Sequence, residues 1–334
     1  MFEILKKLTS LDGVSGMEKT VTDAVIAEID GFCEWQKDNL GNIIAFKKGK
    51  NASAKKLMVD AHLDEVGLII TDITESGFLK FKTVGGINTE ALLSRRVRIN
   101  GTVLGVIGAK PIHLLKGSAL KLPDADSLYI DIGLSNKSDA EGVVSIGDRA
   151  VLLGDYYEND DKILSKALDD RIGCAILIEL LKKDSEYDFY ATFTVQEELG
   201  LRGARTAAFK VDPQSAIMLE GTTAADIAGV EDEKKVCILG DGAVVSFMDR
   251  ATVYDREYYE AALKSGIPCQ AKRAVTGGNN SGAVHLSREG VRSLAISVPC
   301  RYIHTAASVA DKRDIKSAYE LAVYMINGIC GGKL

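Results

Sequence analysis

The sequence lacks the features of a membrane or secreted protein. No apolar run among its 334 residues approaches the roughly 20 residues that a membrane-spanning helix needs. The N-terminal segment MFEILKKLTSLDG has neither the long apolar stretch nor the cleavage site of a secretory signal. The six cysteines are scattered and form no CxxC pair, which argues against a zinc–cysteine site and favours buried thiols. We therefore expect a cytoplasmic protein without a membrane partner.

The sequence also lacks an excess of basic residues. Lys and Arg number 41 against 47 Asp and Glu, so the formal net charge is −6. Proteins that bind nucleic acids need a basic surface for the phosphates, so we exclude nucleic acid as the main partner. One tryptophan and 6% aromatic residues also leave little material for a sugar-stacking cleft.

What the chain does have is enough apolar material for a large core and about two domains. Hydrophobic residues make up 46% of the sequence. Residues 1–70 and 163–334 alternate short apolar strands with helical periodicity, which predicts an α/β domain. Residues 71–162 contain short, closely spaced strands rich in β-branched residues and punctuated by glycine, which indicates an inserted all-β, barrel-like domain. Ser15-Gly-Met-Glu18 matches a capping box and predicts a helix start there.

Side chains that can bind metals recur at predicted strand ends or in loops. In open α/β sheets, ligands bind at the carboxyl ends of the strands. Five segments have this character, and their joint occurrence is the signal: AHLDE (61–65), ALDD (167–170), VQEE (195–198), LE (219–220) and YIH (302–304).

Each candidate also has a purely structural interpretation. His62 could be a core histidine and Asp64 a solvated loop acid. Asp169 and Asp170 precede an apolar helix, so either could be its N-cap, with Arg171 offsetting the repulsion between them. Glu197 and Glu198 are harder to explain structurally, because two acids follow a buried strand. One could bind a metal while the other accepts a proton.

The remaining histidines carry weaker signals. His285 lies in a glycine-rich region before a helix-like stretch, where packing is the favoured interpretation. His113 lies in the predicted insert, where a surface or interface role is favoured.

Taken together, the candidate ligands are two histidines and three carboxylates. Mixed nitrogen and oxygen ligands suit Zn²⁺, Co²⁺ or Mn²⁺ rather than an iron–sulfur cluster or Ca²⁺. Two such ions about 3.5–4 Å apart lower the pKa of a shared water molecule and polarise a carbonyl, which is hydrolase chemistry.

With these segments the chain resembles the M42 family of metallo-aminopeptidases, which includes glutamyl aminopeptidases and the tetrahedral TET peptidases. The motifs that carry the resemblance follow the family's order along most of the chain: AHLDEVG (61–67), KALDDRIG (166–173), TVQEELGLRGA (194–204), GAVHLSREGV (282–291) and RYIHT (301–305). The resemblance implies a mixed-sheet, di-metal peptidase domain split by a β-barrel-like domain that serves dimer formation.

The resemblance also implies roles for individual residues and a cofactor. Two divalent metal ions per subunit are expected, most simply zinc, with cobalt or manganese as alternatives. The implied metal ligands are His62, His304, a bridging Asp169, Glu198 and Glu220. Glu197 would be the general base, which takes a proton from a water molecule to form the metal-bridging hydroxide. Asp64 would orient His62, and the Asp169–Asp170 peptide bond would be cis.

The implied activity is removal of N-terminal residues from peptides. The implied assembly is a homo-oligomer in which dimers build a hollow tetrahedral dodecamer that admits only peptides and unfolded chains.

The chain departs from the family pattern at three positions. Glu220 replaces the usual aspartate, Asn280 replaces the aspartate of a Gly-Gly-Thr-Asp loop, and Ala306 replaces a proline. Because related di-zinc carboxypeptidases have glutamate at the first position, a deacylase or carboxypeptidase-like hydrolase stays an alternative. A catalytically impaired metal-binding homologue is another. An endoglucanase is disfavoured, because Glu197 and Glu198 are neighbours and do not obviously flank a sugar bond.

Overall fold

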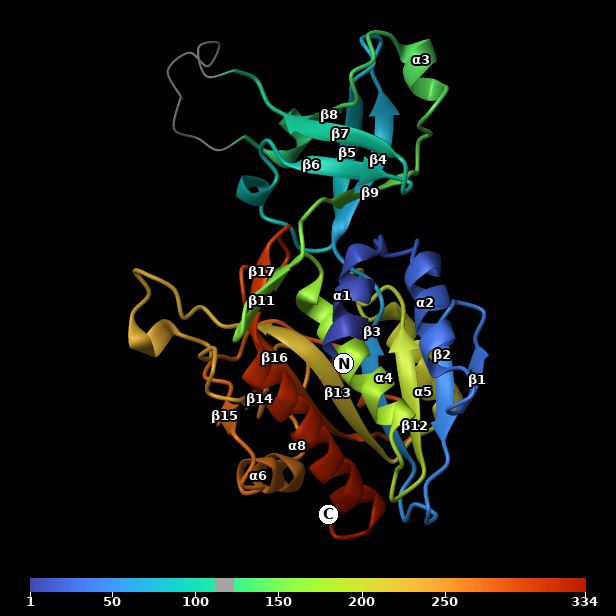
Figure 1. Ribbon diagram of the computed structural model, residues 1–334, viewed down its shortest axis with the longest axis vertical. Helices are drawn as coiled ribbons and strands as arrows, with labels where there is room; N and C mark the ends of the chain where they lie inside the picture. Colours follow the sequence, from blue (N-terminus) through green and yellow to red (C-terminus); the bar gives the residue numbers. More distant parts are fainter. Residues whose placement is uncertain (112–122) are drawn as a thin grey trace.

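The computed structural model describes residues 1–111 and 123–334, and His113 lies outside them. Figure 1 shows a larger α/β domain with a smaller β domain above it. The predicted fold class, an α/β domain with a mixed sheet and a separate barrel-like all-β domain, is confirmed. No helix within the described ranges is long and apolar enough to cross a bilayer.

A mixed sheet runs through the α/β domain. Strands β12, β3, β13 and β16 are parallel neighbours at its centre, and antiparallel strands extend it on both sides. In the described residues the main path is β1 (Glu34–Lys37), β2 (Ile43–Lys47), β12 (Phe189–Thr194), β3 (Leu57–His62), β13 (Ser215–Thr223), β16 (Arg292–Arg301), β17 (Ser308–Asp311), β11 (Lys162–Ser165) and β10 (Tyr157–Glu158). Off this path, β14 (Ala243–Val245) pairs with β16, and β15 (Cys269–Ala271) pairs with β14.

Helices cover both faces of the sheet. One face packs against α1 (Phe2–Ser10), α2 (Lys19–Ile29), α4 (Leu168–Lys182) and α8 (Lys312–Cys330), with α6 (Arg256–Leu263) beside α8. The other face packs against α5 (Arg202–Val211) and α7 (Ser281–Val284).

The sequence of β3 explains why the central strands are buried on both sides. Successive side chains of a strand point to opposite faces. Leu57 and Val59 accordingly join the core under α4, whereas Met58 joins the core under α5. A strand buried on both faces needs a largely apolar sequence, and the polar residues of β3, Asp60 and His62, lie in its carboxyl-terminal half.

The smaller domain is a closed antiparallel barrel with its own apolar core. Its strands, in order around the barrel, are β4 (Gly67–Ile73), β5 (Leu79–Val84), β8 (Tyr129–Asp131), β7 (Val103–Gly108), β6 (Arg96–Ile99) and β9 (Arg149–Leu152). Short helical turns are η1 (Thr89–Ala91), η3 (Ala125–Ser127) and α3 (Lys137–Glu141) in this domain and η4 (Asp232–Lys234) in the other. The barrel strands thus lie within 67–152, whereas the insert was expected at 71–162. At the C-terminal end the difference arises because β10 and β11 pair toward β17 in the main sheet, and at the N-terminal end β4 already begins at Gly67.

Specific polar contacts join the two domains. Arg98 of β6 donates two hydrogen bonds to Asp12, at 2.5 and 2.7 Å. Arg149 of β9 donates to the backbone oxygen of Ser15 at 3.3 Å. Ala306, from the turn before β17, is buried in the core of the barrel. The barrel is therefore packed onto the α/β domain on one side of the metal-ligand candidates.

A helix begins directly after the predicted capping box, but the capping box itself is wrong. Helix α2 starts at Lys19, and its N-cap residue, Glu18, makes no capping hydrogen bond through its side chain. The Ser15 hydroxyl instead donates to Asp64 Oδ2 at 2.5 Å, and Glu18 accepts from Gly16 N. The polar side chain that looked like a local cap is used in a contact 49 residues away in the sequence.

Candidate metal centre

The fold brings the five predicted metal ligands to one edge of the sheet. His62 is the last residue of β3, Glu198 follows β12, and Glu220 lies in the last half of β13. These strands are parallel neighbours, with Thr194 paired with His62, so their carboxyl ends meet at the same edge. Asp169 comes from the start of α4, and His304 comes from the turn between β16 and β17.

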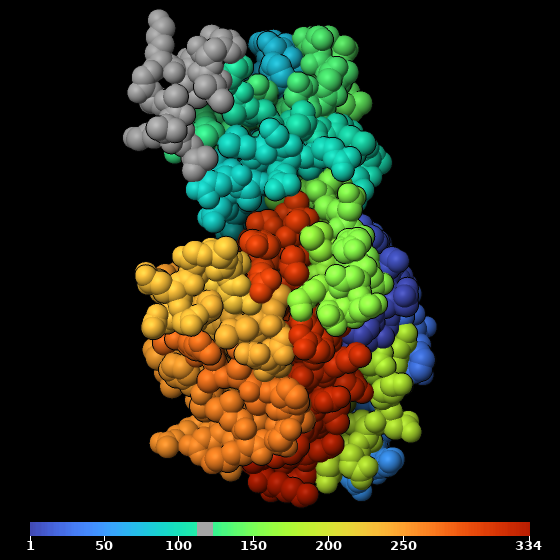
Figure 2. Space-filling model, turned by 60° about the vertical axis from the view of Figure 1, so that its left-hand side comes forward, coloured from blue at the N-terminus to red at the C-terminus, as the bar shows by residue number. Residues whose placement is uncertain are grey.

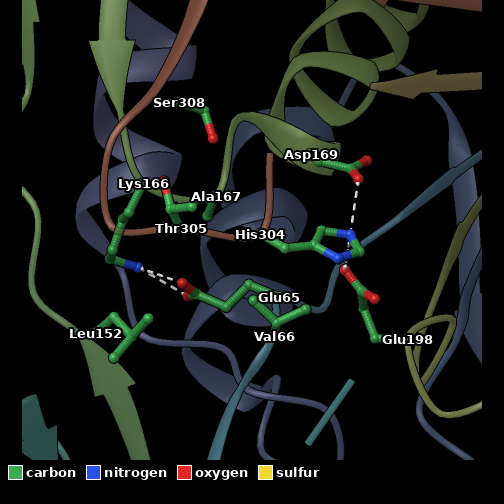
Figure 3. A pocket seen from close by; sticks show the side chains of 10 residues that line it. All are labelled: Glu65, Val66, Leu152, Lys166, Ala167, Asp169, Glu198, His304, Thr305 and Ser308. Atoms are coloured by element: carbon green, nitrogen blue, oxygen red, sulfur yellow. Dashed lines mark hydrogen bonds and ion pairs between the residues drawn. The ribbon is translucent and has the colours of Figure 1, made fainter. Parts of the chain in front are cut away.

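The ligand atoms form two groups that share Asp169. His62 Nε2 lies 3.5 Å from Asp169 Oδ1 and 3.7 Å from Glu220 Oε2. His304 Nε2 lies 3.5 Å from Asp169 Oδ2 and 3.2 Å from Glu198 Oε1. Figure 3 shows the second group, with Asp169 and Glu198 on either side of the His304 ring. Each oxygen of Asp169 therefore faces a different histidine, as a bridging carboxylate would.

The donor set fits divalent cations. The ligand atoms of each group lie within 4.8 Å of one another, and both groups combine one imidazole nitrogen with two carboxylate oxygens, a set that zinc accepts. Glu220 Oε1 is buried and has no hydrogen-bond partner. Burial raises the pKa of Glu220 well above its usual value, and the nearby carboxylates of Asp170 and Glu197 raise it further. A buried carboxylate with one unpartnered oxygen among like charges is costly unless a cation offsets it.

Backbone carbonyls orient both histidines. His62 Nδ1 lies 3.0 Å from the backbone oxygen of Asp64, and His304 Nδ1 lies 2.8 Å from the backbone oxygen of Gly86. A ring whose Nδ1 carries the proton and donates it to a carbonyl presents an unprotonated Nε2 to a metal. In both rings, Nε2 is the nitrogen that faces the carboxylates.

Asp64 has more contacts than the sequence suggested. Its carboxylate Oδ1 lies 3.5 Å from His62 Nδ1, farther than its own backbone oxygen. The carboxylate instead accepts hydrogen bonds from the backbone nitrogens of Glu197, at 2.9 Å, and Glu198, at 3.1 Å. One side chain thus fixes the turn that carries the predicted base and one predicted ligand.

Glu197 lies outside both ligand groups but faces the same space. It lines a cavity of about 430 Å³ together with His62, Asp169 and Glu220. Burial raises the pKa of Glu197, the positive charge of His62 lowers it, and the carboxylate of Glu198 raises it again. A carboxylate with a raised pKa beside a ligand cluster is suited to accept and return a proton.

Asp169 and Asp170, joined by a cis peptide bond, divide the two functions that the sequence left open. Asp170 Oδ1 accepts a hydrogen bond from Gly173 N at 3.0 Å, the contact that an N-cap makes. Its other oxygen accepts from the backbone nitrogen of His62 at 3.1 Å. The carboxylate of Asp169 instead faces the two histidines of the ligand groups. It packs closely on Gly221, where a Cβ atom would lie 2.9 Å from the Asp169 side chain.

Arg171 does not offset these two acids. It is fully buried and donates to the backbone oxygen of Leu63 at 2.5 Å and to Glu65 at 3.2 Å. Lys166 donates to both oxygens of Glu65, at 2.7 and 2.8 Å, as Figure 3 shows. Glu65, Lys166 and Arg171 form a buried ion cluster that joins the loop after His62 to the segment before Asp169. Sequence reasoning missed it, because nothing in the sequence pairs residues about 100 positions apart.

The departure at Asn280 has a structural reason. Asn280 Nδ2 donates to Asp60 Oδ2 at 2.7 Å and to Thr194 Oγ1 at 2.8 Å. An aspartate at position 280 would place a second carboxylate against the buried Asp60. The amide fits where an acid would be repelled.

His285, by contrast, lies outside both ligand groups. Its Nδ1 lies 2.6 Å from the backbone oxygen of Ser281 in α7, the short helix that His285 follows, and the side chain is half-buried.

Comparisons with known proteins agree with this arrangement. Residues 41–321 match the family described as M42 glutamyl aminopeptidase. A lysyl aminopeptidase of Pyrococcus furiosus is 34% identical over 339 residues, which cover 96% of this chain and 95% of that protein.

Two solved structures also match nearly whole chains. The Pyrococcus horikoshii TET1 peptidase, described as assembling into a tetrahedron or a large octahedral shell, has 32% identity, covers 96% of this chain and 98% of its own, and has a TM-score of 0.84. A structure described as an endoglucanase of Thermotoga maritima has 34% identity, covers 98% and 97%, and has a TM-score of 0.81. The family match over most of the chain, together with these relatives, shows that the chain belongs to the M42 family of aminopeptidases, which are peptide hydrolases.

Proposed function

We propose that this protein is a co-catalytic di-metal aminopeptidase that removes N-terminal residues from peptides. The observation that carries the proposal is Asp169, whose two oxygens face His62 and His304 in two separate ligand groups. His62, Asp169 and Glu220 would hold one ion, and Asp169, Glu198 and His304 the other. Zinc is the simplest occupant, with cobalt or manganese as alternatives.

The protein's own residues supply the proton chemistry and the positioning. When bound, two divalent cations would activate a water molecule and polarise the scissile carbonyl. Glu197 takes a proton from the attacking water and returns it to the leaving amine. Asp64 holds the backbone of Glu197 and thereby the position of that carboxylate. Two bound divalent cations would balance the four carboxylates that line the cavity, and a free α-amino group would then bind beside them, which directs cleavage to the peptide N-terminus.

The alternatives are less well supported. A glycoside hydrolase needs two carboxyl groups free to flank a sugar bond, but Glu198 contacts His304 and Glu220 contacts His62. A deacylase or carboxypeptidase-like hydrolase would accept substrates with a blocked N-terminus. A catalytically impaired homologue would bind metal without turnover.

Assembly and location are further parts of the proposal. We infer that dimers form through the barrel domain and build a tetrahedral dodecamer in the cytoplasm, with peptides as substrates. The shells described for the P. horikoshii relative support the assembly.

A panel of aminoacyl 4-nitroanilides and short peptides, assayed with and without a chelator, tests the activity. We expect hydrolysis of substrates with a free N-terminus, loss of activity with chelator, and recovery when Zn²⁺, Co²⁺ or Mn²⁺ is added. Metal analysis should find two ions per subunit in the wild type and fewer in His62→Ala, which loses a ligand. Hydrolysis of N-blocked substrates would favour the deacylase. Silence across the panel with two ions bound would favour the impaired homologue.

Lys272 points to a preference for an acidic N-terminal residue. Among the described residues that line the cavity containing Glu197, it is the only lysine or arginine. Its Nζ donates to the backbone oxygen of Thr276 at 3.1 Å, and no carboxylate of the described residues forms an ion pair with it. Val236 and Thr222 lie on the same cavity wall. A cation there would pair with a glutamate or aspartate side chain of the substrate.

We expect Lys272→Ala to lower kcat/KM about tenfold for substrates with N-terminal glutamate, the loss of about one charge-assisted contact. The value for N-terminal alanine should change less than twofold, because that side chain does not reach the cation. Lys272→Arg should retain most of the preference. The exposed Lys234, outside the cavity, supplies the matched control Lys234→Ala. Equal losses on both substrates would contradict the assignment.

A further inference from the structure

A second and larger cavity opens beside the metal centre, next to the barrel. It has a volume of about 900 Å³, within the range of ligand-binding sites. It shares Thr223, Ile303 and His304 with the cavity that contains Glu197. The two cavities are therefore neighbours that adjoin at these three residues, beside the metal-ligand groups.

Both domains contribute walls to this second cavity. Arg95 and Glu90 come from the barrel domain near η1, whereas Ile227 and Tyr302 come from loops of the α/β domain. Tyr302 is 52% exposed and Ile227 is 37% exposed, so both present apolar surface to the cavity. In Figure 2 the teal barrel, the yellow loop after β13 and the red segment near β17 come together where the molecule narrows between its two domains.

We propose that this second cavity, here called the downstream cavity, binds the substrate residues that follow the cleaved bond, and that Arg95 pairs with the C-terminal carboxylate of a short peptide. The inference rests on the proposed aminopeptidase function. The proposed function places the N-terminal residue of the peptide in the cavity around Glu197, so the remainder of the peptide extends in the other direction, past His304. The apolar faces of Ile227 and Tyr302 then pack against its side chains.

The surroundings of Arg95 leave its charge available. Its Nε donates to the backbone oxygen of Ala91 at 3.3 Å, and none of the described carboxylates forms an ion pair with it. A guanidinium group has further N–H donors in a planar arrangement that matches a carboxylate. Glu90, which also lines the cavity, has the opposite charge and would repel a peptide carboxylate. Substitution of Arg95 should therefore weaken the binding of a peptide carboxylate, and substitution of Glu90 should strengthen it.

Three substrates that share one N-terminal residue distinguish an effect on binding in the downstream cavity from an effect on the chemical step. An aminoacyl 4-nitroanilide has no downstream residues, a free tripeptide has both the residues and the carboxylate, and an amidated tripeptide lacks only the charge. We expect Arg95→Ala to lower the tripeptide-to-anilide ratio of kcat/KM about fivefold, the value of an exposed charge pair. Amidation should lower the ratio of the wild type by the same factor and remove the effect of Arg95→Ala. Glu90→Gln should raise the ratio for the free tripeptide.

The matched control is Arg96→Ala, since Arg96 is exposed, adjacent in sequence and outside the cavity wall. The inference is overturned if Arg95→Ala leaves the ratio at the wild-type value, or if Arg96→Ala lowers it equally. If the wild-type protein hydrolyses neither substrate, the proposed function has failed instead. Calorimetric binding of the free tripeptide to metal-loaded protein then decides: an affinity about fivefold weaker in Arg95→Ala supports the cavity, and an unchanged affinity refutes it.

Discussion

The Glu197→Gln variant is expected to lose a factor of about 10²–10⁴ in kcat, the usual contribution of general acid–base catalysis. Glutamine keeps the length and nearly the volume of glutamate but cannot accept the proton of the attacking water. The backbone at this position should stay in place, because the Asp64 carboxylate holds the nitrogens of both Glu197 and Glu198. Steady-state kinetics on one aminoacyl 4-nitroanilide measures the loss.

Metal content distinguishes a lost base from a lost ligand. Glu197 belongs to neither ligand group, so Glu197→Gln should retain both ions. The matched variant Glu198→Gln removes a carboxylate that lies 3.2 Å from His304 Nε2 and should lower metal occupancy as well as rate. Full activity in Glu197→Gln would refute its role as the base. A loss of metal in that variant would instead place Glu197 among the ligands.

Replacement of Glu65 by alanine is expected to lower the free energy of unfolding by about 3–5 kcal/mol, the cost of leaving buried charges without a partner. Glu65 is 4% exposed and is the carboxylate that both Lys166 and Arg171 contact. Its removal would leave two buried cations facing each other. It would also remove the acceptor for Gly13 N, which ties the segment after α1 to the site. Urea denaturation of the apo proteins gives the difference without a contribution from metal binding.

Glu186→Ala is the matched control for that experiment. Glu186 also pairs with a lysine, at 3.5 Å from Lys50 Nζ, but its side chain is 47% exposed. An exposed pair of this kind contributes at most about 1 kcal/mol. If the two alanine variants unfold with free energies within about 1 kcal/mol of each other, the buried cluster does not stabilise the fold as we infer.

The sequence indicated which residues converge, because one geometric rule covers most of them. His62 ends β3, Glu198 follows β12 and Glu220 lies in the last half of β13, and parallel strands place their carboxyl ends together. The sequence did not show which glutamate faces which histidine, because that depends on strand order, and β3 lies between β12 and β13.

Contacts between distant residues escaped prediction. The Ser15 hydroxyl caps no helix because Asp64 is available to it only after folding. The reason for Asn280 became visible only when Asp60 lay beside it. The sequence does not single out Lys272, because only the fold places this residue, directly after β15, on a cavity wall. Local patterns predict elements and their ends, whereas side-chain partners depend on tertiary packing.

The candidate metal centre depends on both domains, because His304 Nδ1 lies 2.8 Å from the backbone oxygen of Gly86. His304 comes from the α/β domain, but the group that sets its tautomer comes from the barrel domain. An excised α/β domain would keep every ligand and still lose control of one imidazole. A neighbouring subunit that shifts the barrel would therefore, through this single carbonyl, also change the affinity of the proposed metal site at His304.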